Sequence, residues 1–253
     1  MRPAIVFLHG FTHTGASWRA VIEELGERYS AIAPDLRGHG AASDRRPVSF
    51  AACAGDVAEA APERFALVGY SMGGRVALHT ALAHPERVER LVLVGAGPGI
   101  ADEVERNARR EQDEGLAAEI EGSSIESFAD RWGALPILKG QSPEVAARAR
   151  EDRLRNQPDG LAAALRGLGA GTMEPLWGSL DRLRMPVTLV TGERDAKYRK
   201  IAERMAAAVP DARALAVPAA GHAVHLEAPR LMATLIADAL SNLGAASIAP
   251  RPG

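Results

Sequence analysis

The sequence predicts an α/β fold in which a mainly parallel sheet is flanked by helices, and three observations lead to it. Short apolar runs alternate with amphipathic segments along most of the 253 residues, which is the pattern of βαβ units. The runs are continuously apolar, as strands are when helices cover both faces of a parallel sheet. A long stretch without such runs, about 99–184, predicts a helical cap inserted between two strands.

Six apolar runs are the expected strands, and their composition predicts burial on both faces. They are AIVFLH (4–9), YSAIAP (29–34), FALVGY (65–70), RLVLVG (90–95), VTLVTG (187–192) and ARALAV (212–217). The segments of helical spacing between them are approximately 16–27, 49–61, 72–83, 199–208 and 229–242.

The stretch of residues 99–184 is an insertion within one domain, because the strand pattern resumes at Val187. It is rich in Arg, Glu and Ala at helical spacing. Prolines divide it into about four helices: Pro136, Pro143, Pro158 and Pro175. We therefore expect a core of residues 1–98 and 185–243, a cap of residues 99–184, and a flexible tail of residues 244–253.

Composition argues against several classes of function. The net charge of −2 gives no reason to expect nucleic acid or an anionic membrane as a partner, and no apolar run reaches the roughly 20 residues of a membrane helix. Cys53 is the only cysteine, which excludes an internal disulfide and fits a cytoplasmic protein. His13, His79 and His84 lack metal-ligand spacing, and GAGPGI (95–100) lacks the last glycine of a dinucleotide loop. We expect a small-molecule substrate, no metal or organic cofactor, and a monomer or weak homo-oligomer.

Residues 69–73, GYSMG, match the pattern G-x-S-x-G between an apolar run and a helical segment. In this setting the serine occupies a tight strand-to-helix turn, and its small neighbours let the two backbones pass. The turn directs the hydroxyl toward the strand ends and the N-terminus of the next helix toward a developing oxyanion. Ser71 is therefore the candidate nucleophile or base.

A serine hydroxyl becomes reactive when a histidine takes its proton and an acid orients that histidine. Asp195 follows one expected strand and His222 follows the next, so both should reach the same edge of the sheet as Ser71. Glu193 is the alternative acid, but it lies closer to its strand. His225 is the alternative base, and its place at the start of the last helix predicts a surface histidine instead.

An oxyanion hole requires two backbone N–H groups. One is expected from Met72, the residue after the serine. The other is expected from Phe11, in the loop after the first strand, where Gly10 lets the backbone approach closely. His9 is expected to pack at the strand end, and His39 to order a turn.

Several segments together resemble the α/β-hydrolase superfamily over nearly the whole chain, and one branch of it more closely. The segments similar to the SHCHC synthases, or MenH family, of menaquinone biosynthesis are GYSMGGRVAL, NARREQ, FADRW, DRLRNQPDGLAAALRGLG, TGERDAKYRKIA and AGHAVHLEAP. The resemblance implies an α/β-hydrolase fold and a lyase. This lyase eliminates pyruvate from a succinyl-enolpyruvyl-hydroxycyclohexene carboxylate and leaves 2-succinyl-6-hydroxy-2,4-cyclohexadiene-1-carboxylate (SHCHC). It also implies that Ser71 acts as a general base, without an acyl-enzyme and without a cofactor.

The resemblance further implies which residues bind the substrate. They are Arg75, Arg109, Arg155, Trp132 and Tyr70. Arg106 and Arg110 are alternatives to Arg109. Arg75 lies one helical turn beyond Ser71, where a plain esterase gains nothing from a permanent charge. A polycarboxylate, in contrast, would be held there by the planar guanidinium.

Two other functions stay open on the sequence alone. A serine hydrolase with the same triad would cleave an ester or a carbon–carbon bond of a carboxylate-bearing substrate. A non-catalytic small-molecule receptor would keep the fold without its chemistry, although the intact serine, acid and histidine argue against it.

Overall fold

The structure is a computed structural model, and it describes residues 2–241. Its centre is a six-stranded sheet in the order β2-β1-β3-β4-β5-β6, in which every neighbouring pair is parallel. The strands are β1 (Ala4–Leu8), β2 (Ser30–Ile32), β3 (Phe65–Tyr70), β4 (Val88–Val94), β5 (Val187–Gly192) and β6 (Ala212–Val217). The predicted fold class is confirmed, while the expected tail of residues 244–253 lies outside the described residues.

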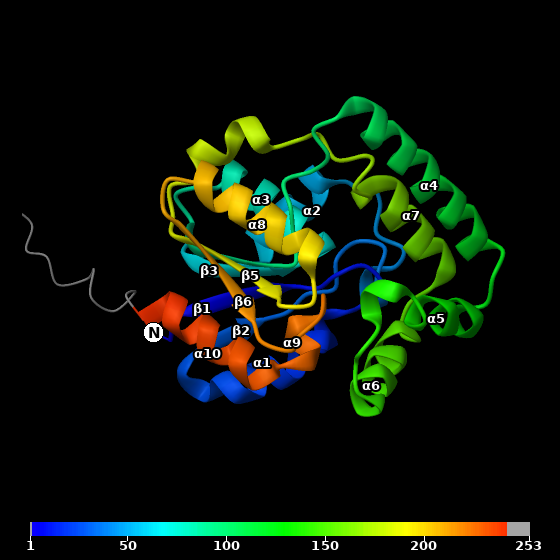
Figure 1. Cartoon of the computed structure of the whole chain (residues 1–253), viewed down its shortest axis with the longest axis horizontal. Coiled ribbons are helices and arrows are strands. Elements are labelled where there is room, and N and C mark those ends of the chain that lie inside the picture. Colours follow the sequence, from blue (N-terminus) through cyan, green and yellow to red (C-terminus); the bar gives the residue numbers. More distant parts are fainter. Residues whose placement is uncertain (1, 242–253) are drawn as a thin grey trace, which may run out of the picture.

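Helices cover both faces of the sheet (Figure 1). Alternate residues of a strand point to opposite faces, so Ile5 and Phe7 of β1 belong to one apolar core, and Val6 and Leu8 to the other. The first core packs against α1 (Arg19–Leu25), α9 (Val224–Glu227) and α10 (Pro229–Leu240). The second packs against α2 (Phe50–Ala60), α3 (Met72–Ala83) and α8 (Ala196–Ala208).

The two edge strands differ from the prediction. Residues of β2 and most of β6 are exposed or only half-buried, although both were expected to be buried on both faces. Each lies at an edge of the sheet, where it pairs with one neighbour only. An apolar run therefore predicts a strand but does not reveal whether that strand is central. The run at 29–34 also shortens to three paired residues in β2.

Between β4 and β5 the described chain forms four α-helices, which lie together beyond one end of the sheet (Figure 1). They are α4 (Glu103–Glu121), α5 (Ile125–Gly133), α6 (Pro143–Arg153) and α7 (Pro158–Leu168). Pro143 and Pro158 occupy the first turns of α6 and α7, where a missing N–H costs no helical bond. We call residues 99–184 the cap. No helix within residues 2–241 combines the length and the apolar character needed to cross a bilayer.

Five short 3₁₀ helices complete the described secondary structure. They are η1 (Gly15–Trp18), η2 (Gly26–Arg28), η3 (Gly40–Ala42), η4 (Pro136–Leu138) and η5 (Trp177–Arg182). The helix expected at 16–27 is divided among η1, α1 and the start of η2, because the chain tightens at both ends of α1.

The fold buries histidines whose titration should control its stability in acid. Burial lowers the pKa values of His9, His13, His39, His79 and His225, because a charged imidazolium would lose its hydration. In the unfolded chain these rings titrate near the ordinary pKa of about 6.5. As the pH falls, the unfolded state therefore takes up protons before the folded state does.

We expect the free energy of unfolding to be steady above about pH 7 and to decrease below about pH 6.5. The loss should approach about 1.4 kcal/mol per pH unit for each such histidine. Urea unfolding at a series of pH values measures this decrease. A free energy of unfolding that stays constant down to about pH 5 would contradict the prediction.

Candidate active site

Ser71 lies in the turn between β3 and α3, and its backbone is strained. Its φ of 51° is in the left-handed region that side chains usually avoid. A Cβ atom on Gly69 would come within 2.6 Å of the carbonyl oxygen of Gly73, and one on Gly73 would collide with the backbone of β1. The two glycines are therefore what allows this turn to pack against the sheet.

The structure brings Ser71, His222 and Asp195 into one hydrogen-bonded series. His222 Nε2 lies 3.2 Å from Ser71 Oγ, and His222 Nδ1 lies 2.6 Å from Asp195 Oδ2. Asp195 follows β5 and caps α8 by accepting a bond from the Tyr198 N–H at 3.3 Å. A carboxylate at Nδ1 keeps the proton on that nitrogen, so Nε2 is free to accept the serine proton.

The two alternative residues are occupied elsewhere. The Glu193 carboxylate accepts a hydrogen bond from the Ala219 N–H at 3.0 Å. His225 was expected at the surface, and this is wrong: it is fully buried, with its ring centre 4.5 Å from that of Trp18 and 4.3 Å from that of Tyr70. Helix α9 is too short for the periodicity of the sequence to show which of its residues face the core.

Two further histidines lie beneath the site. His9 and His39 are fully buried, with ring centres 4.9 Å apart. His9 Nε2 accepts a bond from the Leu36 N–H at 2.9 Å, which ties the end of β1 to the loop after β2. His39 also meets the ring of Phe11 edge-on at 5.8 Å. Both rings therefore support the loop that carries Phe11.

A cavity of about 220 Å³ opens onto the serine and the histidine. The candidate residues that line it are Phe11, Tyr70, Ser71, Met72, Arg75, Arg109, Trp132 and His222. Much of the remaining lining is apolar and comes from the cap: Leu116, Leu135, Ile137, Leu138, Leu165 and Leu168. The sheet edge and the cap thus enclose the site together.

The two residues expected to supply the oxyanion donors, Phe11 and Met72, both line the cavity. Met72 is the first residue of α3, so its N–H has no partner within the helix. Phe11 follows β1, and its N–H donates no hydrogen bond to any residue of the described chain. A Cβ atom on Gly10 would come within 2.6 Å of the Tyr70 ring, so the loop can approach only with glycine there.

Arg75 faces the cavity from α3 and has no carboxylate partner within residues 2–241. Its Nη2 donates to the carbonyl oxygen of Leu168 at 2.8 Å, whereas its buried Nε has no partner there. Burial is the main cause that lowers the pKa of this guanidinium, and the nearby charge of Arg109 acts in the same direction. A largely desolvated cation without an acid is unfavourable until an anion meets it.

Arg109 is the cap arginine that reaches the cavity. Its Nε donates to Asp113 at 2.8 Å, and the rest of its guanidinium is partly exposed to the cavity. The alternatives point elsewhere: Arg106 bonds to the carbonyl oxygen of Ile100, and Arg110 to that of Gly171. Trp132 lies opposite, with its ring edge-on to Phe11 at 5.2 Å.

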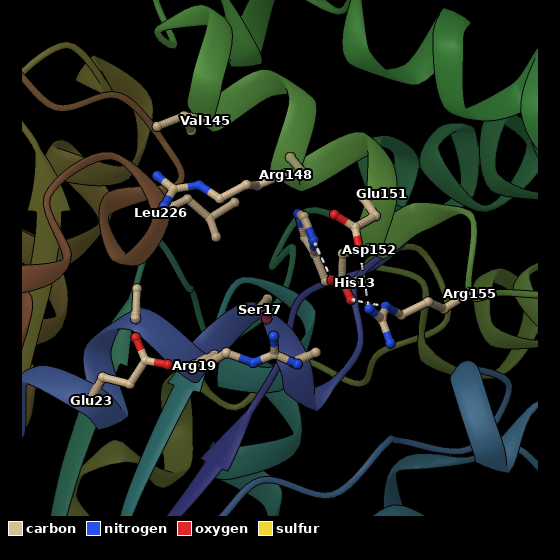
Figure 2. Close-up of a pocket in the computed structure, with 13 residues that line it drawn as sticks. His13, Ser17, Arg19, Glu23, Val145, Arg148, Glu151, Asp152, Arg155 and Leu226 are labelled. Carbon is tan, nitrogen blue, oxygen red and sulfur yellow. Dashed lines mark hydrogen bonds and ion pairs between the residues drawn. The ribbon is translucent and has the colours of Figure 1, made fainter. Parts of the chain in front are cut away.

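Arg155 lies apart from these residues. It lines a second cavity of about 180 Å³ between α1 and α6, beside Glu151 and Asp152 (Figure 2). Its side chain is 48% exposed and is 3.4 Å from the Glu151 carboxylate. Arg155 was expected to join Arg75 and Arg109, but it follows the end of α6 and is not among the residues that line their cavity.

Arg153 is the residue that the sequence reasoning missed. It is 2% exposed, its Nε and Nη2 have no partner within residues 2–241, and burial lowers its pKa. Its Nη1 lies close to Gly133, and its charge is felt by Tyr70. Spacing could have revealed it, because Arg153 continues the buried positions Val145 and Ala149 at intervals of four along α6.

Arg153 is not among the residues that line the cavity, whereas two further residues that were missed do line it. Lys197 and Tyr198 follow Asp195 at the start of α8, and both line the cavity. The Tyr198 ring lies 4.8 Å from that of His222. Three cationic side chains and one carboxylate, Asp113, therefore face the cavity, which gives it a positive balance. The signal available in the sequence was that Lys197 and Tyr198 lie close to Asp195.

Comparisons with known proteins show the family and the fold of the chain. A family model described as the alpha/beta hydrolase family matches residues 5–235. A putative 2-succinyl-6-hydroxy-2,4-cyclohexadiene-1-carboxylate synthase of Bacillus subtilis is 36% identical over 95% of this chain and 91% of that protein. The structure of MenH from S. aureus is 31% identical with a TM-score of 0.89, covering 96% of this chain and 94% of that one. A thermophilic esterase from Thermogutta terrifontis, solved with malate bound, is 25% identical with a TM-score of 0.83, covering 95% and 90%.

Proposed function

The chain belongs to the alpha/beta hydrolase family, and from that premise we propose that it is an SHCHC synthase. Such an enzyme is a lyase of menaquinone biosynthesis that eliminates pyruvate from a succinyl-enolpyruvyl-hydroxycyclohexene carboxylate. The observation that carries the proposal is Arg75, a half-buried guanidinium whose buried Nε has no partner in the described chain and which has no carboxylate partner there, in the same cavity as Ser71. The hydrogen-bonded triad supplies the chemistry, and the unpaired cations supply the class of substrate.

The proposed substrate carries several carboxylates, and the site holds several cations to receive them. Arg75 lies on the sheet side and Arg109 on the cap side, with Lys197 beside the triad. We propose Arg153, in place of Arg155, as the further cap arginine that binds the substrate, because burial without a partner is costly until an anion arrives. Carboxylates fixed at these separate points would define the position of the ring above Ser71.

The triad would act as a general base. The Ser71 Oγ proton passes to His222 Nε2 as Oγ takes a proton from the ring carbon beside the succinyl carbonyl. Asp195 stabilises the imidazolium that forms. The freed electron pair creates a new ring double bond, the bond from the ring to the enolpyruvyl oxygen breaks, and the departing enolate takes up a proton to become pyruvate. No bond forms between Ser71 and the substrate.

The N–H groups of Phe11 and Met72 would stabilise the negative charge that develops on the succinyl oxygen during proton removal. The apolar lining strengthens this effect, because it keeps water away from the charge. The same donors would serve a tetrahedral intermediate in ester cleavage. The distinction between lyase and hydrolase therefore rests on which substrate atom the cations place over Ser71.

Product analysis tests the proposal. Incubation with the succinyl-enolpyruvyl substrate should release pyruvate, and a short-chain nitrophenyl ester should be a poor substrate. Rapid ester cleavage without pyruvate would favour the hydrolase alternative. This alternative is tested because the chain is also similar to an esterase. Failure to react with a serine-directed fluorophosphonate would favour a non-catalytic receptor.

A matched pair of variants tests which arginine at the end of α6 or just after it binds the substrate. Arg153→Met should lower kcat/KM by about 100-fold, because a buried cation that pairs with a carboxylate is lost. Its thermal stability should be unchanged or higher, since methionine replaces an unpaired buried charge. Arg155→Met should change kcat/KM by less than about 3-fold, as expected for an exposed ion pair. Steady-state kinetics of both variants decide the assignment, and the opposite ranking would return it to Arg155.

A further inference from the structure

The loop that carries Phe11 is a strained turn. Residues Gly10 to His13 close it with a bond from the His13 N–H to the Gly10 carbonyl oxygen at 3.1 Å. Its third residue, Thr12, has a φ of 72°, and this position of such a turn normally holds glycine or asparagine. A β-branched residue tolerates the left-handed region poorly. The turn that presents the Phe11 N–H therefore depends on restraint from its surroundings.

Asn156 supplies part of that restraint from the cap. Its Nδ2 donates to the Thr12 carbonyl oxygen at 2.8 Å, and its Oδ1 accepts from the Gly40 N–H at 3.0 Å. The side chain is 1% exposed, so no water competes for these bonds. Asn156 thus joins the strained residue to the loop after β2.

Asp152 also restrains the turn from the cap, through both of its carboxylate oxygens. One oxygen accepts bonds from the Thr14 N–H and from His13 Nδ1, both at 3.0 Å, and the other accepts from the Thr14 hydroxyl at 2.5 Å. Figure 2 shows His13 and Asp152 facing each other beside the second cavity. Burial acts to raise the pKa of Asp152, but the bonds from His13 and Thr14 outweigh it, and the net shift is downward. The carboxylate is therefore held in its ionised, accepting form.

We propose that Asp152 and Asn156 are positioning residues that aim the Phe11 N–H into the oxyanion hole, so that the cap takes part in catalysis as well as in substrate binding. Both residues come from α6 or the segment after it, and their bonds end on the residues that follow Phe11. The Phe11 ring also meets Trp132 of α5. The inference rests on the proposed role of the Phe11 N–H, but not on the identity of the substrate.

The test uses Asn156→Asp, which keeps the shape and the Oδ1 acceptor. It replaces the donating amide with an oxygen that repels the Thr12 carbonyl. The readout is the rate at which Ser71 reacts with a small neutral fluorophosphonate, whose phosphoryl oxygen occupies the oxyanion hole and needs no arginine. We expect this rate to fall by at least about 10-fold, because a misplaced oxyanion donor loses most of its effect. Asp152→Asn should slow the reaction in the same way.

Two further variants separate positioning from general loosening of the cap. Ile120→Val removes one methyl group from a buried side chain of α4 that does not line the cavity. It breaks none of the hydrogen bonds that join the cap to the turn, so it should lower the melting temperature and leave the rate nearly unchanged. Thr12→Gly in the Asn156→Asp background should recover part of the rate, because glycine adopts this φ without restraint.

The inference is overturned if folded Asn156→Asp reacts at the wild-type rate, or if Ile120→Val slows the reaction equally. It stands if the Asn156→Asp rate falls while the wild type releases no pyruvate. That outcome would contradict the proposed function but not the positioning role of Asp152 and Asn156.

Discussion

Ser71→Ala should lower pyruvate release by about three orders of magnitude or more, because it removes the group that accepts the ring proton. The 3.2 Å and 2.6 Å contacts on either side of the His222 ring make the three residues one unit. His222→Ala and Asp195→Asn should therefore each cause a comparable loss, and double variants should add little to it. Steady-state release of pyruvate, with circular dichroism to confirm folding, measures these losses.

Glu193→Gln is the matched control for the acid. Glu193 lies two residues before Asp195, and its carboxylate accepts from the Ala219 N–H. Glutamine keeps an accepting oxygen, so this variant should retain nearly full activity. Nearly full activity of Asp195→Asn together with an inactive Glu193→Gln would show that the acid has been assigned to the wrong residue.

Arg75→Ala should cost about 2–5 kcal/mol of transition-state stabilisation in the elimination, the range for losing one partner of a desolvated charge pair. The fold should survive, because the one protein hydrogen bond of this side chain in the described chain is to the Leu168 carbonyl. Arg75→Lys should recover only part of the loss, because an ammonium group cannot form two parallel bonds to a carboxylate. The measurement is kcat/KM for pyruvate release.

Reaction of the same variants with a small neutral fluorophosphonate provides the control. That reaction needs Ser71, His222 and the oxyanion hole but no carboxylate ligand, so Arg75→Ala should leave its rate nearly unchanged. Ester hydrolysis as the true function would give the reverse pattern, with neutral-ester cleavage unaffected and no pyruvate from either protein. An unchanged kcat/KM for pyruvate release in Arg75→Ala would contradict the role given to Arg75.

The central part of the fold could be predicted from the sequence because local pattern determines it. Strands β3, β5 and β6 have the predicted bounds, since each is an apolar run between turn residues. Helix α3 also has its predicted bounds, because the glycine-flanked serine marks its start. Exposure of β2 and β6 could not be predicted, because strand order within a sheet depends on long-range pairing that no single run encodes.

Candidate residues that follow strand ends could be placed relative to one another from the sequence, whereas the directions of side chains in the cap could not. Strand ends of a parallel sheet converge on one edge, which places Asp195 and His222 beside Ser71 without further knowledge. The direction of a side chain on a helix depends on rotation about the helix axis. Arg153 is the last residue of α6 and is buried, whereas Arg155 follows the helix and has a side chain that is 48% exposed. A similarity between sequence segments cannot resolve that difference, whereas the buried stripe of α6 can.

The central claim is that Ser71 removes a ring proton in an elimination. It is tested most directly by placing deuterium at the ring carbon beside the succinyl carbonyl and following pyruvate release in single turnovers of the wild-type protein. We predict that the deuterated substrate releases pyruvate more slowly, with a primary isotope effect, because breaking this bond limits the chemical step. Equal rates from the two substrates, or no pyruvate from either, would contradict the account.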